Sequence, residues 1–379
     1  MNIAIVTTSY PSTLTPTKHV FLQKLVWTFA DLGHNCVVIS PVDKKNTLLK
    51  ELPTETDELS PNNNLIKIYY PRYTNLGFRK RFGINLQKMS LNNFTNSVYR
   101  AVEKSPLKFD VIYSHFLTPA GMAASRIGKK LSIPAFVAFG ESDTWSIEGF
   151  GIKNIIEELK NITGFIAVST ENKRRLIKLG IASEEKIKVF PNGVDLTKFY
   201  KTDKKEARKY FGFSQQDFIV AFVGQFNERK GVLRVVNALE NEEGVKVAFA
   251  GKGPLQPFTK NSVYNDIVNP DDMPKFLNAA DIFLLPTLNE GCCNAIIEAM
   301  ACGLPIVSSN LPFNEDLLEA NNSIGINPQD EQEIKNAVLT LKNNPSLLKE
   351  YSEGALEKAS QLDINIRATN ISDWIKAIQ

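Results

Sequence analysis

Residues 281–308 read DIFLLPTLNEGCCNAIIEAMACGLPIVS, and this stretch decides the fold. It begins and ends with short apolar runs, Asp281–Leu285 and Leu304–Ser308, in which apolar and polar residues do not alternate. Such runs are typical of strands buried on both faces of a parallel sheet. Between them, Asn294–Cys302 has the character of a helix that ends at Gly303. The stretch therefore predicts a strand, a helix and a second, parallel strand.

The same alternation extends through the whole chain. Amphipathic segments at Phe21–Leu32 and 172–180 end at Gly33 and Gly180, as helices commonly do. Seven further runs of five or six residues are rich in β-branched or aromatic side chains: Ile3–Thr7, Cys36–Ser40, Asp110–Ser114, Ala135–Phe139, Gly164–Val168, Phe218–Val223 and Val245–Ala250. Strands alternating with helices in both halves predict an α/β protein with two Rossmann-like, doubly wound domains.

A turn cluster at Pro191-Asn192-Gly193 marks the expected boundary between the two domains. At roughly 150 residues per domain, a chain of 379 residues accommodates domains at 1–190 and 191–362. A last helix at about 363–379 could pack back on the first domain or stay with the second. Open α/β sheets bind ligands beyond the carboxyl ends of their strands, so we expect the two sheets to face each other across a cleft.

Composition and charge exclude several classes of protein. With 43% hydrophobic and 22% charged residues, the chain is neither disordered nor fibrous. The net charge of +3 gives no reason to expect nucleic acid. Four cysteines do not make a disulfide framework, and none lies at metal-ligand spacing from a histidine. We find no signal-peptide pattern and no apolar run near the roughly 20 residues of a membrane helix, so we expect a cytoplasmic protein without a metal.

The usual phosphate-binding glycine motifs are absent. The first strand leads into residues 7–11, which contain no glycine. Gly251-Lys252-Gly253-Pro254 lacks the third glycine of a dinucleotide fingerprint, and the segment from Gly224 to Gly231 has its lysine before the glycine. These departures disfavour a nicotinamide-dependent dehydrogenase and a P-loop ATPase.

The loop and helix after the Asp281–Leu285 run are better suited to a nucleotide-sugar. Asn294 is a good helix cap, and the free amides of the helix start suit a diphosphate. Glu298, one turn into the helix, could accept hydrogen bonds from a ribose diol, while Glu290 would face a group beyond the phosphates. The alternative is that both glutamates are ordinary solvated surface carboxylates.

Lys230 supports the nucleotide-sugar interpretation. It follows the Phe218–Val223 run after a short loop, which places it at the same end of the sheet. A lysine at that point can neutralise a diphosphate and stabilise it as a leaving group. The alternative is a solvated lysine at a helix start, paired with Glu228 near Arg229.

The run Glu290–Gly303 resembles the two-glutamate motif of the family 4 retaining glycosyltransferases, which have the GT-B fold. Other pieces occur in the family's order and extend the resemblance over nearly the whole chain: Leu32-Gly33-His34, Val168-Ser169, Pro191-Asn192-Gly193-Val194-Asp195, Gly224 to Gly231 and Ala250-Gly251-Lys252-Gly253-Pro254. It is strongest from residue 164 to residue 312.

The resemblance implies roles for individual residues. Glu298 would hold the ribose, Lys230 the diphosphate and the backbone near Val268 the base, with Glu290 close to the donor sugar. It implies a UDP-linked donor, retention of anomeric configuration and no metal or other cofactor. The implied donor-binding residues are Gly224, Gln225, Arg229, Lys230, Val268, Glu290, Gly291, Cys292, Cys293, Asn294, Ala295 and Glu298.

The chain departs from the family's pattern at several positions. Gln225 stands where an arginine usually accompanies Lys230, and Phe139 stands where a histidine is common. Glu141, after Phe139, is a candidate for contact with the donor sugar, and His115, after the Asp110–Ser114 run, is a candidate cleft residue or an ordinary core histidine. With Glu290 and Lys230, these two complete the candidate catalytic set.

The two halves differ in charge. Residues 1–195 contain 25 basic and 17 acidic residues, and residues 196–379 contain 19 and 24. In the first half Arg72, Arg79, Lys80 and Arg81 are interleaved with aromatic residues, a mixture that suits an anionic membrane surface or a lipid-diphosphate acceptor, and is also compatible with nucleic acid or a solvated loop. The first domain binds the acceptor in the family, so we favour a lipid-diphosphate acceptor over nucleic acid. We therefore expect peripheral contact of this domain with the inner leaflet of the cell membrane.

The sequence thus predicts a hexosyltransferase-type glycosyltransferase that moves a sugar from a nucleotide-sugar to a glycan or a polyprenyl-diphosphate-linked saccharide. Bacterial surface-polysaccharide synthesis, such as that of a capsule, is the expected setting. The alternative from a different class is a catalytically weak, nucleotide-sugar-binding partner subunit, which Phe139 and Gln225 keep open.

Overall fold

The computed structural model describes residues 1–47, 52–77, 80–81, 84–141 and 145–378. The chain forms two compact units. Unit 1 consists of Met1–Phe190 together with Ala368–Gln379, and unit 2 consists of Pro191–Arg367. The division therefore falls at the Pro191-Asn192-Gly193 turn and again inside the last helix.

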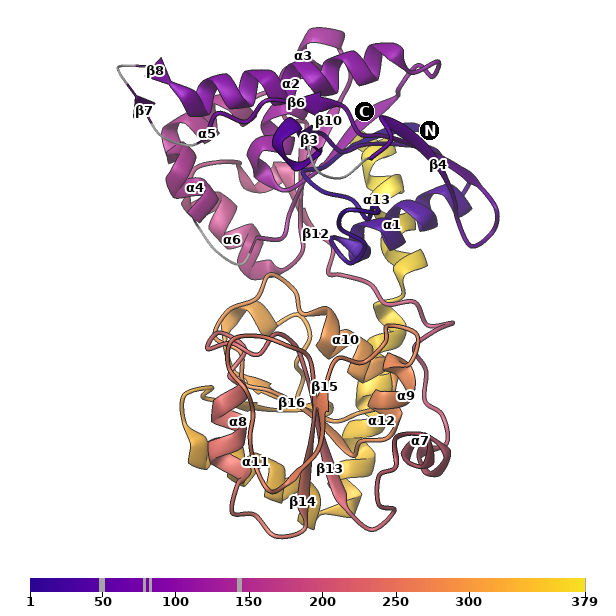
Figure 1. Ribbon diagram of the computed structural model, residues 1–379, viewed down its shortest axis with the longest axis vertical. Coiled ribbons are helices and arrows are strands. Elements are labelled where there is room, and N and C mark those ends of the chain that lie inside the picture. The colour runs from indigo at the N-terminus through magenta and orange to yellow at the C-terminus, as the bar shows by residue number, and fades with distance from the viewer. Residues whose placement is uncertain (48–51, 78–79, 82–83, 142–144, 379) are drawn as a thin grey trace. The chain divides into compact units, whose positions relative to one another are not determined.

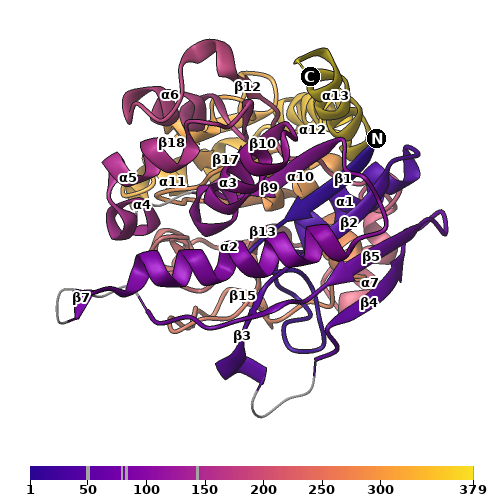
Figure 2. The same cartoon turned by 90° about the horizontal axis from the view of Figure 1, so that it is seen from above.

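Unit 1 is built on an eight-stranded sheet with the order β12-β11-β10-β9-β1-β2-β5-β4. All neighbours pair in parallel except β4 and β5, which are antiparallel. Its strands are β1 (Asn2–Val6), β2 (Asn35–Ile39), β4 (Glu55–Leu59), β5 (Leu65–Tyr69), β9 (Val111–His115), β10 (Ala135–Phe139), β11 (Gly164–Ala167) and β12 (Ile187–Val189). Figure 2 shows β1, β2, β5 and β4 side by side.

The helices of unit 1 cover both faces of this sheet. They are α1 (Val20–Asp31), α2 (Leu86–Lys104), α3 (Met122–Leu131), α4 (Trp145–Phe150), α5 (Ile152–Leu159) and α6 (Thr170–Lys178). Two-residue strands form the pairs β3 (Val42–Asp43) with β6 (Arg72–Tyr73) and β7 (Lys80–Arg81) with β8 (Ile84–Asn85). Ala4 and Val6 lie in one buried cluster and Ile3 and Ile5 in another, because successive strand residues point to opposite faces. Both faces are therefore core.

Unit 2 is built on a parallel six-stranded sheet with the order β15-β14-β13-β16-β17-β18. Its strands are β13 (Phe218–Val223), β14 (Val245–Ala250), β15 (Ser262–Asp266), β16 (Ile282–Leu285), β17 (Ile306–Ser309) and β18 (Ser323–Ile326). Its helices are α7 (Lys204–Phe211), α8 (Val232–Leu239), α9 (Met273–Asn278), α10 (Asn294–Ala301), α11 (Glu331–Asn343) and α12 (Pro345–Gln361). Figure 1 shows α8 and α11 on one side of the sheet and α9, α10 and α12 on the other.

The last helix, α13 (Ile364–Ile378), begins in unit 2 and ends in unit 1. Its Trp374 ring packs 5.5 Å from that of Phe136 and 5.8 Å from that of Phe190. A Cβ on Gly164 would lie 2.6 Å from the Trp374 ring, so only glycine leaves room for it. The question that the sequence left open is thus answered, because the carboxyl-terminal part of this helix packs on unit 1.

The order of strands marks one crevice in each sheet. In unit 1 β1 lies between β2 and β9, so the strand order reverses direction at β1 and β9. In unit 2 β13 lies between β14 and β16, and the order reverses in the same way at β13 and β16. Ligands of doubly wound sheets bind outside the carboxyl ends of strands at such a switch point. Two places are therefore singled out by topology alone, one after β1 and β9 and one after β13 and β16.

Candidate functional sites at the two switch points

In unit 2 the switch point is framed by the loop 224–231 after β13 and the loop 286–293 after β16. The backbone N–H of Leu288 donates to the carbonyl of Arg229 at 2.8 Å, which joins the two loops. Gly231 has a φ of +79°, and a Cβ there would lie 2.6 Å from the carbonyl oxygen of Pro286. A glycine is thus required where the loops cross.

Glu290 lies at the centre of this crevice and is held by three side chains. Its Oε1 atom accepts a hydrogen bond from Thr287 at 2.8 Å and lies 2.7 Å from both Arg229 Nη1 and Lys230 Nζ. The Glu290 and Lys230 side chains are each only 12% exposed, so their pairing is shielded from water. The structure therefore brings together Glu290, Lys230 and Arg229, which the sequence had placed in one site.

The charge of Lys230 is maintained in spite of its burial. Burial opposes the ammonium, but charge interactions with the side chains of Cys293 and Glu290, and the hydrogen bond to Glu290, outweigh it and raise the pKa of Lys230. Burial raises the pKa of the Cys293 thiol, whose sulfur lies 4.0 Å from Lys230 Nζ. Lys230 thus supplies a buried positive charge to the crevice, next to the Cys293 side chain.

The start of α10 lies beside this charged group. The N-cap is Cys293 rather than Asn294, and no side chain caps the helix, so the predicted capping role of Asn294 is wrong. Asn294 instead accepts a hydrogen bond from the Asn192 side chain at 2.9 Å, and Asn192 also donates to the carbonyl of Cys292 at 3.1 Å. The Asn192 side chain therefore stabilises the end of the 286–293 loop through these two hydrogen bonds. Glu298 is half-buried on α10, and Ala295 belongs to its first turn.

The remaining predicted donor residues lie on the loops that follow β13, β15 and β16. Gly224 is bonded to Ala250 through its backbone N–H at 3.0 Å, and a Cβ on Gly251 would lie 1.9 Å from the Gly224 carbonyl oxygen. This backbone approach explains the glycine at 251. Gln225 is exposed, whereas Val268, on the loop after β15, and Gly291 are buried.

In unit 1 the switch point contains a cavity of about 590 Å³. Thr8 and Thr118, which follow β1 and β9, line it together with aromatic and amide side chains. The Tyr73 and Phe94 rings meet edge to face at 5.3 Å, and Gln87 donates to the carbonyl of Gly149 at 2.8 Å. An adjoining cavity of about 380 Å³ shares four lining residues with it: Thr8, Lys18, Tyr73 and Asn75.

Glu141 lies at the carboxyl end of β10 and joins two loops of unit 1. Its Oε1 accepts from the backbone N–H of Leu117 at 2.8 Å, and its Oε2 accepts from that of Gly140 at 3.1 Å. Burial raises the pKa of this carboxyl to about 7, against the opposing effect of these amides and of Arg175. The structure thus gives Glu141 a clamping function between the loops after β9 and β10.

His115, the last residue of β9, is buried among aromatic rings. Its ring lies 4.6 Å from that of Phe116 and 5.1 Å from that of Phe21, and its Nδ1 lies 3.4 Å from the Tyr113 hydroxyl. Phe116 and Phe21 also contact the His19 ring. The histidine therefore belongs to an aromatic cluster next to the unit 1 crevice.

The predicted basic cluster is only partly described. Arg72 donates to the carbonyl of Tyr70 at 3.0 Å and to that of Leu52, so its guanidinium is engaged with the backbone. Lys80 and Arg81 form the short strand β7, and Arg79 lies outside the described residues.

Sequence reasoning missed three features of these sites. Thr287 was not singled out although it directly follows a strand, and Asn192 was treated only as part of a turn. The Thr8 and Thr118 positions were also missed, although a strand-end search of the first half could have found them. In the described part of the chain, no group of three or more His, Cys, Asp or Glu side chains is placed to hold a metal ion, and no helix is long and apolar enough to cross a membrane.

Comparison with known proteins identifies the chain. The family described as Glycosyltransferase Family 4 matches residues 19–198, and the family described as Glycosyl transferases group 1 matches residues 217–344. The chain belongs to glycosyltransferase family 4. The family resemblance of the sequence is therefore confirmed, and the second match includes both loops that frame the unit 2 crevice.

Several named glycosyltransferases are similar over much of the chain. A putative teichuronic acid biosynthesis glycosyltransferase of Bacillus subtilis is 25% identical over 354 residues, which cover 89% of this chain and 88% of that protein. The UDP-Gal:alpha-D-GlcNAc-diphosphoundecaprenol alpha-1,3-galactosyltransferase of Escherichia coli is 29% identical over 248 residues, 59% of this chain and 63% of that one.

Solved structures confirm the fold of this glycosyltransferase. Sucrose-phosphate synthase from Thermosynechococcus elongatus has a TM-score of 0.80 at 15% identity, covering 100% of this chain and 99% of that one. HepE from Anabaena, in complex with UDP and glucose, has a TM-score of 0.73 at 19% identity and 100% coverage of both chains. The chain thus has the predicted GT-B fold, with two Rossmann-like units.

Proposed function

We propose that this glycosyltransferase moves a hexose from a UDP-sugar to a glycan or lipid-linked saccharide, with retention of anomeric configuration. The observation that carries the proposal is the Lys230–Glu290–Arg229 group at the unit 2 switch point, beside a helix start that no side chain caps. A shielded positive charge and a helix start are the chemistry that a sugar diphosphate requires.

The donor would lie along the unit 2 crevice. Lys230, Arg229 and the first turn of α10 would hold the diphosphate, since all three present positive charge or N–H groups there. Glu298 would accept hydrogen bonds from the ribose, and the backbone near Val268 would meet the base. Glu290 would turn part of its carboxylate toward the sugar when the diphosphate takes over Lys230.

The proposed chemical step is attack from the side on which the leaving group departs. The bond between the anomeric carbon and the UDP oxygen breaks as the acceptor oxygen bonds to that carbon, and the departing phosphate oxygen takes the acceptor's proton. Lys230 stabilises the negative charge that develops on the diphosphate. Because this charge is supplied by the protein, we expect turnover to need no metal ion and to survive a chelator.

The acceptor would bind at the unit 1 switch point. Aromatic rings, amides and hydroxyls line its cavity, and this set suits sugar rings with their many hydroxyl groups. The names of the relatives support a saccharide acceptor in surface-polysaccharide or glycolipid synthesis, including one linked to a polyprenyl diphosphate. We further propose that the protein works in the cytoplasm, with its basic segment near residues 72–81 against the inner leaflet.

Two measurements test these proposals. Purified protein is incubated with a panel of UDP-sugars, and release of UDP is followed with and without a chelator. We expect at least slow hydrolysis of one donor, unaffected by the chelator, whereas UDP binding without any turnover would indicate a non-catalytic partner subunit. Co-sedimentation with phosphatidylglycerol vesicles at low salt tests the membrane contact, and absence of binding would contradict it.

A further inference from the structure

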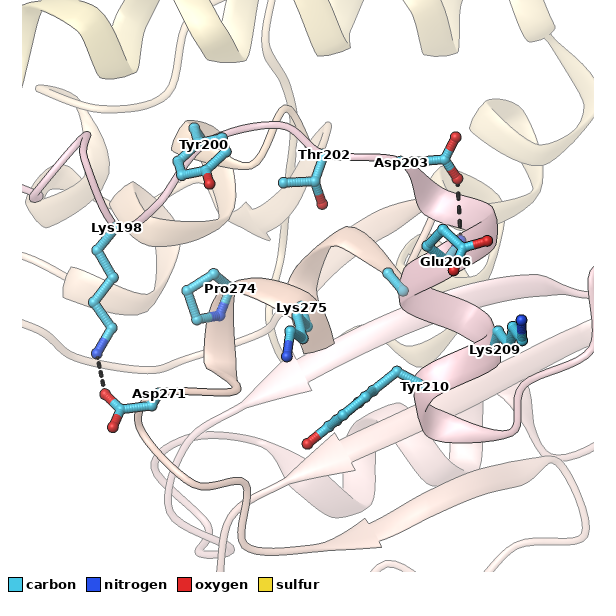
Figure 3. A pocket seen from close by; sticks show the side chains of 11 residues that line it. Lys198, Tyr200, Thr202, Asp203, Glu206, Lys209, Tyr210, Asp271, Pro274 and Lys275 are labelled. Carbon is cyan, nitrogen blue, oxygen red and sulfur yellow. Dashed lines mark hydrogen bonds and ion pairs between the residues drawn. The ribbon is translucent and has the colours of Figure 1, made fainter.

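Unit 2 has a second cavity, of about 800 Å³, that is separate from the donor crevice. It lies between α7, α9 and the extended segment 198–203 (Figure 3). Its wall on α7 is one face of that helix, formed by the N-cap residue Asp203 and by Glu206, Ala207, Lys209 and Tyr210. None of the residues placed above in the donor site lines it.

Two tyrosines line this cavity and are unusually exposed for aromatic residues. Tyr200 is 54% exposed and Tyr210 is 56% exposed. The Lys275 ammonium lies 4.4 Å from the centroid of the Tyr210 ring, over one of its faces, and the Phe211 ring is 5.1 Å away. These contacts fix the orientation of the Tyr210 ring while more than half of the residue remains accessible. Figure 3 shows Tyr210 and Lys275 extending into the same space.

The polar groups of the lining divide into paired and available ones. Lys198 is paired with Asp271 at 2.7 Å, and Asp203 caps α7 by accepting from the backbone of Lys205 and Glu206. Among the described residues, no side-chain partner is found for the Glu206 carboxylate, the Lys209 ammonium or the hydroxyl groups of three residues: Tyr200, Thr202 and Tyr210. Groups that are available for hydrogen bonds therefore surround two aromatic rings. They are a carboxylate that accepts, an ammonium that donates and three hydroxyls that do both.

The charge of the lining indicates what kind of ligand it would take. Three lysines and three carboxylates line the cavity, so their charges cancel. A lining without net charge gives no attraction to a phosphate, a uronate polymer or an anionic membrane. Exposed aromatic faces with adjacent donors and acceptors suit instead a neutral ligand with apolar ring faces and a hydroxyl-bearing rim.

We infer that this cavity is a second, non-catalytic binding site for a neutral oligosaccharide. Sugar rings would stack on Tyr210 and Tyr200, while Glu206, Lys209 and Thr202 would bond their hydroxyls. A cavity of about 800 Å³ is large enough for two or three sugar rings. Such a site would hold a saccharide on the enzyme outside the step of sugar transfer, and its existence does not depend on the proposed donor or acceptor.

Calorimetric titration of the full chain, saturated with UDP, tests the inference. The probes are three neutral trisaccharides, maltotriose, cellotriose and chitotriose, with trigalacturonate as the charged comparison. We expect at least one neutral trisaccharide to bind, and Tyr200→Ala and Tyr210→Ala each to weaken that binding about tenfold. Glu206→Gln should weaken it less, because an amide keeps one acceptor oxygen.

Two control variants show whether the binding belongs to this cavity. Phe258→Ala removes an aromatic residue that is 78% exposed and lies outside the cavity lining, and Tyr73→Ala alters the unit 1 cavity. Neither should change the affinity for the trisaccharide. The inference is overturned if no neutral trisaccharide binds, if trigalacturonate is preferred, or if binding is lost in Tyr73→Ala but kept in the Tyr200 and Tyr210 variants. Unchanged UDP affinity verifies that each variant is folded, and turnover of UDP-sugars is scored separately.

Discussion

The two switch points have the same topology but contrasting chemistry. In unit 2 the crevice after β13 and β16 is lined by charged groups at short distances, with Lys230 and Arg229 both 2.7 Å from Glu290. In unit 1 the cavity after β1 and β9 is lined by rings, amides and hydroxyls together with Lys18, and Glu141, at the end of β10, bonds to backbone N–H groups. Topology thus determines where a ligand binds, and the side chains of the strand-end loops determine which ligand it is.

Lys230→Ala should have the largest effect, because it removes the buried cation of the unit 2 crevice. We expect kcat to fall about a thousandfold, as when one preorganised group that stabilises a developing anion is lost. The measurement is the rate of UDP release from the donor that turns over. Lys335→Ala is the matched control, since it breaks an ion pair with Glu242 that lies outside both crevices. A kcat within tenfold of the wild type would remove Lys230 from the chemistry.

Glu298→Ala should affect donor binding without affecting the unit 1 crevice. We expect UDP affinity to fall about thirtyfold, since hydrogen bonds to a charged group are worth about 2 kcal/mol. Calorimetric titration with UDP measures this change. Glu353→Ala, on an exposed part of α12, serves as the control. Unchanged UDP affinity in Glu298→Ala would contradict the ribose assignment.

Tyr73→Ala is the corresponding change in unit 1. We expect the KM for the acceptor to rise about tenfold with little change in kcat, which is the pattern of lost ground-state binding. UDP affinity should stay the same, because this ring lines only the unit 1 cavities. Tyr99→Ala, on α2, is the control, because its hydroxyl bonds to Glu103 of the same helix and its ring is covered by Lys130 of α3. If UDP affinity changed while the KM for the acceptor did not, the assignment of the acceptor to unit 1 and of the donor to unit 2 would be contradicted.

The sequence was sufficient for the core of both sheets but not for their edges. The apolar runs that it marks as strands agree with β1, β2, β9, β10, β11, β13, β14, β16 and β17 to within about two residues at each end. It did not single out β4, whose residues Glu55–Leu59 are mostly polar and half-exposed. This strand exists because it pairs with β5, a long-range contact that local hydrophobicity does not encode.

The sequence named candidate site residues, but it did not predict the contacts between them. The bonds from Thr287 and Arg229 to Glu290 depend on the conformation of two loops, which Gly231 and the Leu288–Arg229 hydrogen bond determine. Asn294 illustrates the same limit. Its residue type predicted a cap, but the helix begins at that residue and its side chain is engaged by Asn192 across the domain-boundary turn.

Glu141→Gln should have the smallest effect on sugar transfer, and it tests whether the unit 1 carboxylate acts on stability. The pKa of Glu141 is raised to about 7 in the folded state from an ordinary value of 4.5. The protonated carboxyl is therefore favoured by folding, so its contribution to stability is complete below pH 4.5 and is lost as the pH rises through 7. We expect the wild type to lose about 3 kcal/mol relative to the glutamine variant over this interval, because each unit by which folding raises a pKa corresponds to about 1.4 kcal/mol.

Urea unfolding of both proteins between pH 4.5 and 8 measures this difference directly, since the glutamine side chain does not titrate. Glu157→Gln, a carboxylate whose side chain is 69% exposed, is the control and should run parallel to the wild type at every pH. A constant difference between the wild type and Glu141→Gln would show that the carboxyl is already ionised throughout. In that case the contrast with Glu290 would be one of partners only, namely side-chain cations in unit 2 and backbone N–H groups in unit 1.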